Sequence, residues 1–391
     1  MSDFKLDFGD TETAFADKSN SELREKHRLF RMMNSPVLNE LGTRSATFAL
    51  SLGLPVEWLI KNTVFEQFCG GETIQECQPT VDRLGHYKIG TILDYSVEGK
   101  SAEEDFERTK DETILNLKRA KNDDDIPFAV FKVTGIAPLG TLEKISSDAP
   151  LKESNKVKWE NAKRRVFEIC SYAHEISQEV FIDAEESWIQ NAIDILATDM
   201  MEQFNREKPL IFNTVQLYRT DRLQFLKDSH LKAKEDGYIY AVKLVRGAYM
   251  EKERERAEEY SYPSPIQPDK EATDRDFDEA VIYCLDNLDS LAFVAGTHNE
   301  ESTQRLAQLM EERGIEHGHP RVFFSQLYGM SDNLSYVLAD KGYNVSKYVP
   351  YGPVADAIPY LIRRARENTS VKGQMSRELD LIAKELKRRG L

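Results

Sequence analysis

The stretch 127-PFAVFKVTG-135 decides the fold class, because it combines the composition of a buried strand with a turn at its end. Phenylalanine and valine favour strands, and a short apolar run closed by glycine indicates a strand buried on both faces. Seven further runs have a similar β-rich composition: 88-KIGTILDY-95, 178-QEVFID-183, 210-LIFNTVQLY-218, 238-YIYAVKLV-245, 291-LAFVAGT-297, 321-RVFFSQL-327 and 345-VSKYVP-350. The sequence therefore predicts eight strands.

Helical patterns follow these strands, among them residues 156–176, 186–204, 300–314 and 353–368. Strands that alternate with helices are typical of parallel βαβ units. Eight such units favour a closed (β/α)8 barrel of the TIM type over an open doubly wound sheet. The GxGxxG turn of dinucleotide-binding sheets and the P-loop are both absent from the sequence. We therefore predict an α/β barrel over residues 86–370.

Helical segments flank the predicted barrel at residues 1–85 and 371–391, and an acidic segment, 251–274, separates the fifth strand from its helix. Barrel enzymes often carry an insertion at that point, so we interpret the acidic segment as one. The helices expected before the barrel are 21–34, capped by Ser21, then 36–53, and one that runs from Pro55 to Gly70.

Composition and charge exclude several classes of protein. The net charge of −15 argues against nonspecific nucleic-acid binding and against tight adsorption to anionic lipid. The four cysteines form no CxxC pair, which argues against a disulfide framework and fits a reducing compartment. The N-terminus lacks the apolar core of a signal peptide, and no apolar run is long enough to cross a bilayer. We expect an intracellular, cytoplasmic protein.

Polar residues end nearly every predicted strand. Active sites of such barrels lie at the C-terminal ends of the strands, although loop starts are often polar for structural reasons alone. Lys132 is the clearest candidate, because a lone cation on a buried strand must be paired or functional. The full set of strand-end residues is Lys132, Asp183, Gln216, Arg246, His298, Gln326 and Tyr348.

The motif 182-IDAEES-187 carries three carboxylates at the end of the third strand. Asp183 is the expected site residue because it ends the strand, and Glu185 is expected on the same face. Glu186 is interpreted as a helix N-terminal charge, which the helix dipole favours. Neither a metal-ligand cluster nor a Ser-His-Asp or Cys-His arrangement is indicated by the spacing.

The stretch 360-YLIRRARENTS-370 places Tyr360, Arg363, Arg364 and Glu367 on one broad helix face. A surface salt bridge between Arg363 and Glu367 would explain part of this pattern. The position after the eighth strand favours a second interpretation, in which two planar guanidinium groups hold a carboxylate.

Taken together, these residues make the chain resemble the proline dehydrogenase family. The resemblance runs from about residue 86 to 370 and rests on an ordered set of motifs: 93-LDYSVEG-99, 131-FKVTG-135, 182-IDAEES-187, 243-KLVRGAY-249, 297-THN-299, 326-QLYGM-330 and 360-YLIRRARENTS-370. It implies a distorted (β/α)8 barrel that binds FAD and oxidises L-proline to Δ1-pyrroline-5-carboxylate.

The resemblance also implies roles for individual residues. The expected catalytic residues are Lys132, Asp183, Tyr249, Arg363 and Arg364, with Lys132 and the two arginines around the substrate carboxylate. Leu244, Tyr348 and Tyr360 are expected near the substrate ring, and Glu98 is expected to pair with Arg363 when the site closes. The residues expected around FAD are Asp183, Gln216, Lys243, Arg246, Gly247, Ala248, Thr297, His298, Asn299 and Gln326.

Two departures from bifunctional bacterial members concern the flavin contacts. Lys243 stands where many of them have arginine and Arg246 where they have lysine, so charge is retained while hydrogen-bond geometry differs. The segment after Gln326 also differs from theirs. Because the sequence ends at Leu391, with no aldehyde dehydrogenase domain after the barrel, we expect a monofunctional enzyme whose product passes to a separate pyrroline-5-carboxylate dehydrogenase.

Alternatives stay open at this point. Hydroxyproline dehydrogenase is the nearest, although the resemblance associates a tyrosine at position 348 with proline. A lyase or aldolase that uses Lys132 as a Schiff base is a different class, and a noncatalytic binding protein is a third. The family typically passes electrons to a membrane quinone, which implies peripheral membrane contact. Residues 376–391 fit either a membrane-surface helix or a solvated helix with cations at its end.

Overall fold

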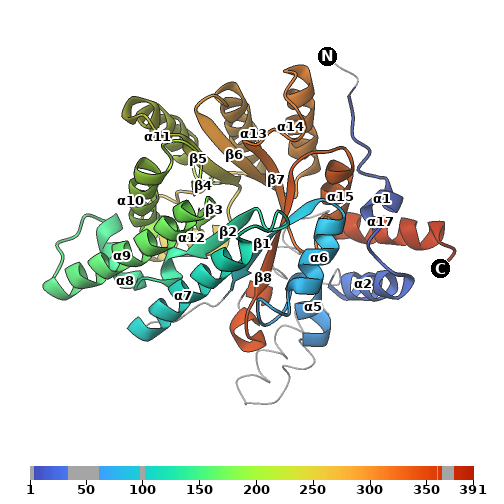
Figure 1. The fold of residues 1–391 in the computed structure, drawn as a ribbon, viewed down its shortest axis with the longest axis horizontal. Coiled ribbons are helices and arrows are strands. Elements are labelled where there is room, and N and C mark those ends of the chain that lie inside the picture. Colours follow the sequence, from blue (N-terminus) through green and yellow to red (C-terminus); the bar gives the residue numbers. More distant parts are fainter. Residues whose placement is uncertain (1–3, 34–60, 97–101, 359, 363–373) are drawn as a thin grey trace. The chain divides into compact units, whose positions relative to one another are not determined.

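Eight parallel strands form a closed barrel in the order β1 to β8, as the sequence predicts (Figure 1). The computed structural model describes residues 4–33, 61–96, 102–358, 360–362 and 374–391. Each strand lies within its predicted run except β8, which extends one residue further. The strands are β1 Ile89–Tyr95, β2 Phe128–Lys132, β3 Glu179–Asp183, β4 Ile211–Gln216, β5 Tyr240–Val245, β6 Leu291–Gly296, β7 Val322–Leu327 and β8 Val345–Tyr351.

The chain divides into two compact units, and the three segments expected from sequence stay a prediction. The first unit comprises residues 1–5 and 99–325, and the second comprises residues 6–98 and 326–391. The helices of the first unit are α7 Glu103–Ala120, α8 Leu139–Ser146, α9 Glu153–Glu175, α10 Ser187–Phe204, α11 Arg222–Asp236, α12 Met250–Glu259, α13 Lys270–Asp286 and α14 Glu300–Glu312.

Phenylalanine rings from several strands of the first unit pack against one another. The rings of Phe128 and Phe181 stack at 4.4 Å between centroids, and Phe212 meets both edge-on. Phe323 of β7 packs edge-on against Phe128 at 4.9 Å. Because alternate residues of a strand share a face, Phe181 points the same way as Asp183 two residues later. The charged end of β3 therefore lies next to apolar side chains on the same face of the strand.

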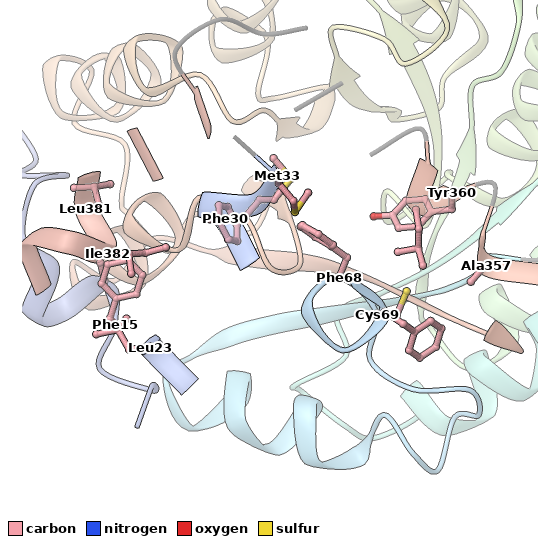
Figure 2. Packing of buried hydrophobic residues seen from close by; sticks show 14 of the residues in the cluster. Phe15, Leu23, Phe30, Met33, Phe68, Cys69, Ala357, Tyr360, Leu381 and Ile382 are labelled. Carbon is pink, nitrogen blue, oxygen red and sulfur yellow. The ribbon is translucent and has the colours of Figure 1, made fainter. Parts of the chain in front are cut away.

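The second unit combines residues 6–98 with the C-terminal part of the chain, residues 326–391. Its helices are α1 Thr11–Ala14, α2 Asn20–Met33, α5 Glu66–Phe68, α6 Gln78–His86, α15 Asp332–Asp340 and α17 Gln374–Arg388, with a π-helical turn at Lys61–Phe65. Helix α17 lies beside α2 and α1 (Figure 1). Figure 2 shows that Phe15, Phe30, Leu381 and Ile382 from these segments belong to one buried cluster, which also contains Tyr360.

This packing bears on the two interpretations of the C-terminal helix. Ile382 is fully buried in the cluster, and Leu381 is nearly so. At the basic end, Arg388 and Arg389 both pair with Glu385, and Arg389 also donates to the backbone oxygens of Phe15 and Lys18. The apolar face is used inside the protein, which argues against a membrane-surface helix. Among the described residues, none of the helices has the length and apolarity needed to span a bilayer.

The start of α2 corrects one prediction. Ser21 lies inside the helix, and Ser19 caps it instead: the Glu22 amide donates to Ser19 Oγ at 3.3 Å, and the Ser19 amide donates to the Glu22 carboxylate at 2.8 Å. This reciprocal pair is a capping box. The predicted helix 36–53 lies outside the described residues, whereas the one expected to end at Gly70 does end before that residue.

Candidate active site

Asp183 bridges two lysines at the C-terminal end of the strands of the first unit. Lys132 ends β2 and is the register partner of Asp183, with its Nζ 3.3 Å from Asp183 Oδ2. Lys243 of β5 donates to the other oxygen, Asp183 Oδ1. Three strands thus bring two ammonium groups to one carboxylate, and sequence reasoning had singled out all three residues.

The surroundings of these charges are largely dry. Asp183 is 8% exposed and Lys243 is 6% exposed, and the Lys243 ammonium lies 4.9 Å from the centroid of the Phe181 ring. Removing a charge from water is costly unless it is paired, so each group depends on the others. The Lys132 side chain keeps 21% of its surface exposed and is the most exposed of the three.

Glu185 connects the ends of β2, β3 and β4. Its carboxylate accepts hydrogen bonds from the backbone amide of Thr134, at 2.9 Å, and from the Thr134 hydroxyl. Its backbone oxygen accepts from the Gln216 side chain at 2.6 Å, and its amide donates to Gln190 at 2.9 Å. Burial raises the pKa of Glu185 to about 7, although the bonds from Thr134 and the charge of Lys132 oppose that rise.

Arg246 is held by groups on two helices and a strand end. Its guanidinium donates to Asp274 at 2.7 Å, to the Thr297 hydroxyl at 2.6 Å and to the Ser302 hydroxyl at 2.9 Å. Its planar group also covers the Phe277 ring at 4.4 Å. Arg246 therefore ties the loop after β5 to α13 and to the start of α14.

The three residues 297-THN-299 lie directly before α14, and Asn299 is its N-cap. Thr297 Oγ1 accepts from Arg246 and from the Asn299 amide, and Asn299 caps the helix by accepting from the Ser302 amide at 3.0 Å. His298 between them is half-buried. Helix N-termini favour anions, because their amides and dipole point outward.

The loop after β5 requires glycine at position 247. Gly247 has φ +132°, and a Cβ there would overlap the Tyr218 ring. Gly247 and Ala248 are exposed, and Tyr249 is half-buried. Leu244 is fully buried, and strand alternation turns it to the face of β5 opposite Lys243, so its expected substrate contact stays a prediction.

The remaining candidate residues divide into two sets. Gln326, Tyr348 and Tyr360 belong to the second unit. Gln326 accepts from the Ser335 hydroxyl at 2.8 Å, the backbone oxygen of Tyr348 accepts from the Tyr328 amide at 2.9 Å, and Tyr360 is 6% exposed. The residues of the carboxylate clamp and its gate, Glu98, Arg363, Arg364 and Glu367, lie outside the described residues.

A comparison with known protein families identifies the family of this chain. The family described as proline dehydrogenase matches residues 77–377 of the chain. The chain belongs to the proline dehydrogenase family. The matched range includes every candidate residue named above, among them those of the second unit.

Several relatives in this family are similar over most of their length. The carbapenem antibiotics biosynthesis protein CarD of Pectobacterium carotovorum is 35% identical over 322 residues, 82% of this chain and 83% of its own. The hydroxyproline dehydrogenase of Xenopus laevis is 33% identical over 409 residues, 95% of this chain and 88% of its own. The mitochondrial proline dehydrogenase 1 of Dictyostelium discoideum is 30% identical over 434 residues, 98% of this chain and 75% of its own.

A solved structure shows the same fold. Proline utilization A from Bdellovibrio bacteriovorus, crystallised after inactivation by N-propargylglycine, superposes with a TM-score of 0.74 at 20% identity. The match covers 93% of this chain and 38% of that one. It agrees with the closed barrel described here.

In this member of the family, sequence reasoning missed three supporting groups. Thr134 pairs with Glu185, Asp274 holds Arg246, and Glu253 of α12 binds Ser187 at the start of α10. Asp274 and Glu253 stand in the acidic segment, where many neighbours also carry charge. Composition therefore gave no means to single them out.

Proposed function

We propose that this protein oxidises L-proline to Δ1-pyrroline-5-carboxylate with FAD and passes the electrons to a quinone. The observation that carries the proposal is the trio Lys132–Asp183–Lys243 in a chain of the proline dehydrogenase family. Lys132 ends its strand with a side chain that is 21% exposed, and an ammonium group at the C-terminal end of a barrel strand suits an anionic ligand. A substrate carboxylate is such a group.

We assign different residues to the carboxylate and to the ring of the substrate. Lys132 is the most exposed cation of the trio, and we assign it to the substrate carboxylate together with Arg363 and Arg364. Asp183 fixes the position of Lys132, and rigid placement of a substrate next to its acceptor lowers the entropic part of the barrier. Tyr249, Tyr348 and Tyr360 are proposed to pack around the pyrrolidine ring, and Glu98 to pair with Arg363 when the site closes.

The donor set at the ends of β4 to β7 fits FAD. Gly247 and Ala248 are exposed, and the N-terminus of α14 is a helix end of the kind that favours an anionic group such as a diphosphate. Lys243 and Arg246 are cations of the kind that stabilise a reduced flavin. When bound, FAD would supply the acceptor for the hydride that leaves the proline ring. The residues assigned to it are Asp183, Gln216, Lys243, Arg246, Gly247, Ala248, Thr297, His298, Asn299 and Gln326.

The visible spectrum of the purified protein tests this proposal. We expect a flavin absorption band that L-proline bleaches under anaerobic conditions. The Lys132→Met variant should keep its flavin and need far more proline for bleaching, whereas Lys144→Met on α8 serves as a matched control with wild-type behaviour. A protein that binds no flavin, or whose flavin proline does not reduce, would contradict the proposal.

Hydroxyproline oxidation is the second candidate, because the Xenopus relative that covers 95% of this chain is a hydroxyproline dehydrogenase. The two substrates differ by one ring hydroxyl, and the tyrosine that we propose beside the ring at position 348 would leave little room for it. We expect kcat/KM for L-proline to exceed that for trans-4-hydroxy-L-proline. The opposite ranking would assign the protein to the second substrate.

Two further partners belong to the proposal. A membrane quinone as acceptor implies transient contact with a membrane, and a separate pyrroline-5-carboxylate dehydrogenase would consume the product. The Schiff-base lyase alternative gains no support from the family match. Borohydride trapping of Lys132 with a carbonyl substrate would revive it.

A further inference from the structure

The acidic segment after β5 forms a strap across neighbouring strand ends. We define the strap as residues 250–267, which include α12. At one end of it, Glu253 is fully buried and accepts two hydrogen bonds from Ser187, from the amide at 2.5 Å and from the hydroxyl at 2.6 Å. Ser187 is the first residue of α10, where a carboxylate is favoured by the helix dipole.

Neighbouring contacts strengthen this end of the strap. Lys252 pairs with Glu186, and Arg256 pairs with Glu143 of α8. Arg256 also stacks over the Trp188 ring at 4.4 Å. Ion pairs that keep some exposure are individually weak, so the fully buried Glu253 is the main anchor.

The other end of the strap pairs with the loop after β4. The Gln267 amide donates to Tyr218 O at 2.7 Å, and the Thr220 amide donates to Pro265 O at 2.9 Å. Arg219 forms an antiparallel bridge with Ile266. The strap is thus fastened to the ends of β3 and β4 while it continues from β5.

The loop of residues 246–249 is held between these two attachments. The Tyr218 amide donates to Arg246 O at 2.7 Å, and the Tyr218 ring lies against Gly247. Tyr249 is the N-cap residue of α12, and its backbone oxygen accepts from the Glu253 amide at 2.9 Å. The residue that anchors α12 is therefore one helical turn from Tyr249.

We propose that Glu253 is a positioning residue that fixes Tyr249 and the loop 246–249 for substrate binding through its attachment to Ser187. The role of Tyr249 in substrate binding rests on the proposed function. Glu253 touches the start of α10 and acts on the substrate site through α12. Without it, the first turn of α12 loses its attachment, and the loop that ends β5 gains freedom.

Three variants test this proposal. Glu253→Ala removes both bonds to Ser187, and it should raise KM for L-proline about tenfold, within the range that small misplacements of a site produce. Glu253→Gln should recover most of the loss, because the amide oxygen still accepts from the Ser187 amide and the amide nitrogen can donate to the hydroxyl. Glu255→Gln on the exposed face of the same helix should behave as wild type.

Hydrogen exchange supplies a readout that does not depend on activity. Backbone amides of residues 247–253 should exchange faster in Glu253→Ala than in wild type, with exchange in the strands unchanged. If Glu253→Ala does not fold, Ser187→Ala removes one of the two bonds and should shift both KM and exchange in the same direction.

Wild-type KM together with wild-type exchange over residues 247–253 in Glu253→Ala would overturn the proposal, even if the melting temperature falls. A wild-type protein without proline oxidation would instead overturn the proposed function. The exchange data would then still decide whether Glu253 holds the loop.

Discussion

The two units of this protein each contain a carboxylate that bridges two lysines, in very different settings. In the first unit, Asp183 binds Lys132 and Lys243 at the strand ends, and the Lys132 side chain stays 21% exposed. In the second unit, Asp332 binds Lys26 at 2.6 Å and Lys347 at 2.9 Å.

The side chains of the second group are almost entirely buried. Lys26 and Asp332 are each 4% exposed and Lys347 is fully buried. The Lys347 ammonium also donates to the backbone oxygen of Met330 at 2.5 Å, and Glu378 of α17 accepts from the Ser331 amide. Burial alone would raise the pKa of Asp332, but Lys26 and Lys347 outweigh it and hold that pKa far below its usual range.

The comparison teaches that charge composition does not distinguish a structural network from a site. What distinguishes them is the exposure of their cations, since the Lys132 side chain is 21% exposed whereas Lys26 is 4% exposed and Lys347 is fully buried. The Asp332 network links α2, α15, α17 and β8 and stabilises the second unit. The Asp183 network includes one partly exposed cation, Lys132, at the end of the barrel where barrel enzymes bind substrates.

The largest effect on stability is expected from Asp332→Asn. It removes the carboxylate that pairs with both buried lysines and leaves Glu378 near both of them and Asp17 near Lys26, and breaking a buried pair typically costs about 3–5 kcal/mol. Denaturant unfolding should show this loss in the free energy of unfolding. The double variant Asp332→Asn, Lys347→Met removes one charge of each sign and should recover part of it. If Asp332→Asn is as stable as wild type, the Asp332 network does not stabilise the second unit and the comparison fails.

Asp183→Asn should affect chemistry more than stability. Asp183→Asn removes the carboxylate that pairs with the buried Lys243, but the partly exposed Lys132 can regain water, so we expect a smaller loss of stability than for Asp332→Asn, where both lysines are buried. Because Lys132 loses its fixed position, kcat/KM for L-proline should fall about 100-fold, roughly 2.7 kcal/mol of transition-state stabilisation. Steady-state kinetics with flavin content measured alongside checks this. Equal losses of stability in both variants, with activity intact in Asp183→Asn, would reverse the assignment of the two networks.

Glu185 is expected to make a smaller contribution to stability, and this contribution depends on pH. Its pKa is raised from 4.5 to about 7, whereas Asp332, with two lysines, shifts the other way. Below pH 4.5, Glu185 is protonated in both the folded and the unfolded state. Between 4.5 and about 7 the unfolded chain releases the proton first, so the stability contributed by the protonated form is lost as pH rises.

Glu185→Gln removes this titration while it keeps a hydrogen-bonding side chain. The variant should lose less stability than wild type between pH 4.5 and pH 8, by about 2 kcal/mol, on a scale of about 1.36 kcal/mol per pKa unit. Glu179, whose pKa is also raised to about 7 by burial, titrates in both proteins and cancels in the comparison. Unfolding curves at both pH values measure the difference, and parallel pH dependences would contradict it.

The sequence predicted the barrel well because strand composition and alternation are local properties. It also pointed to Lys132 as a lone cation on a buried strand. The same reasoning applies to Lys347 in 345-VSKYVP-350, and only the structure separates the two. The partners of Lys347 lie on α15 and, through Asp332, on α2, which are distant in sequence, so no local pattern reports them.

The acidic segment is a second example in which the sequence does not report a contact between distant residues. Its position between the fifth strand and its helix predicted an insertion, and α12 confirms that one is present. Burial of Glu253 depends on where α10 begins in space. No property of the run 251-EKERERAEE-259 distinguishes Glu253 from the exposed Glu255.

A crystal structure of the flavin-bound, reduced protein with L-proline tests the central claim most directly. The account predicts the proline carboxylate within hydrogen-bonding distance of Lys132 Nζ, about 3 Å, while Asp183 keeps its bridge to Lys243. A proline carboxylate bound elsewhere, with Lys132 held by Asp183 and no contact to the ligand, would contradict it.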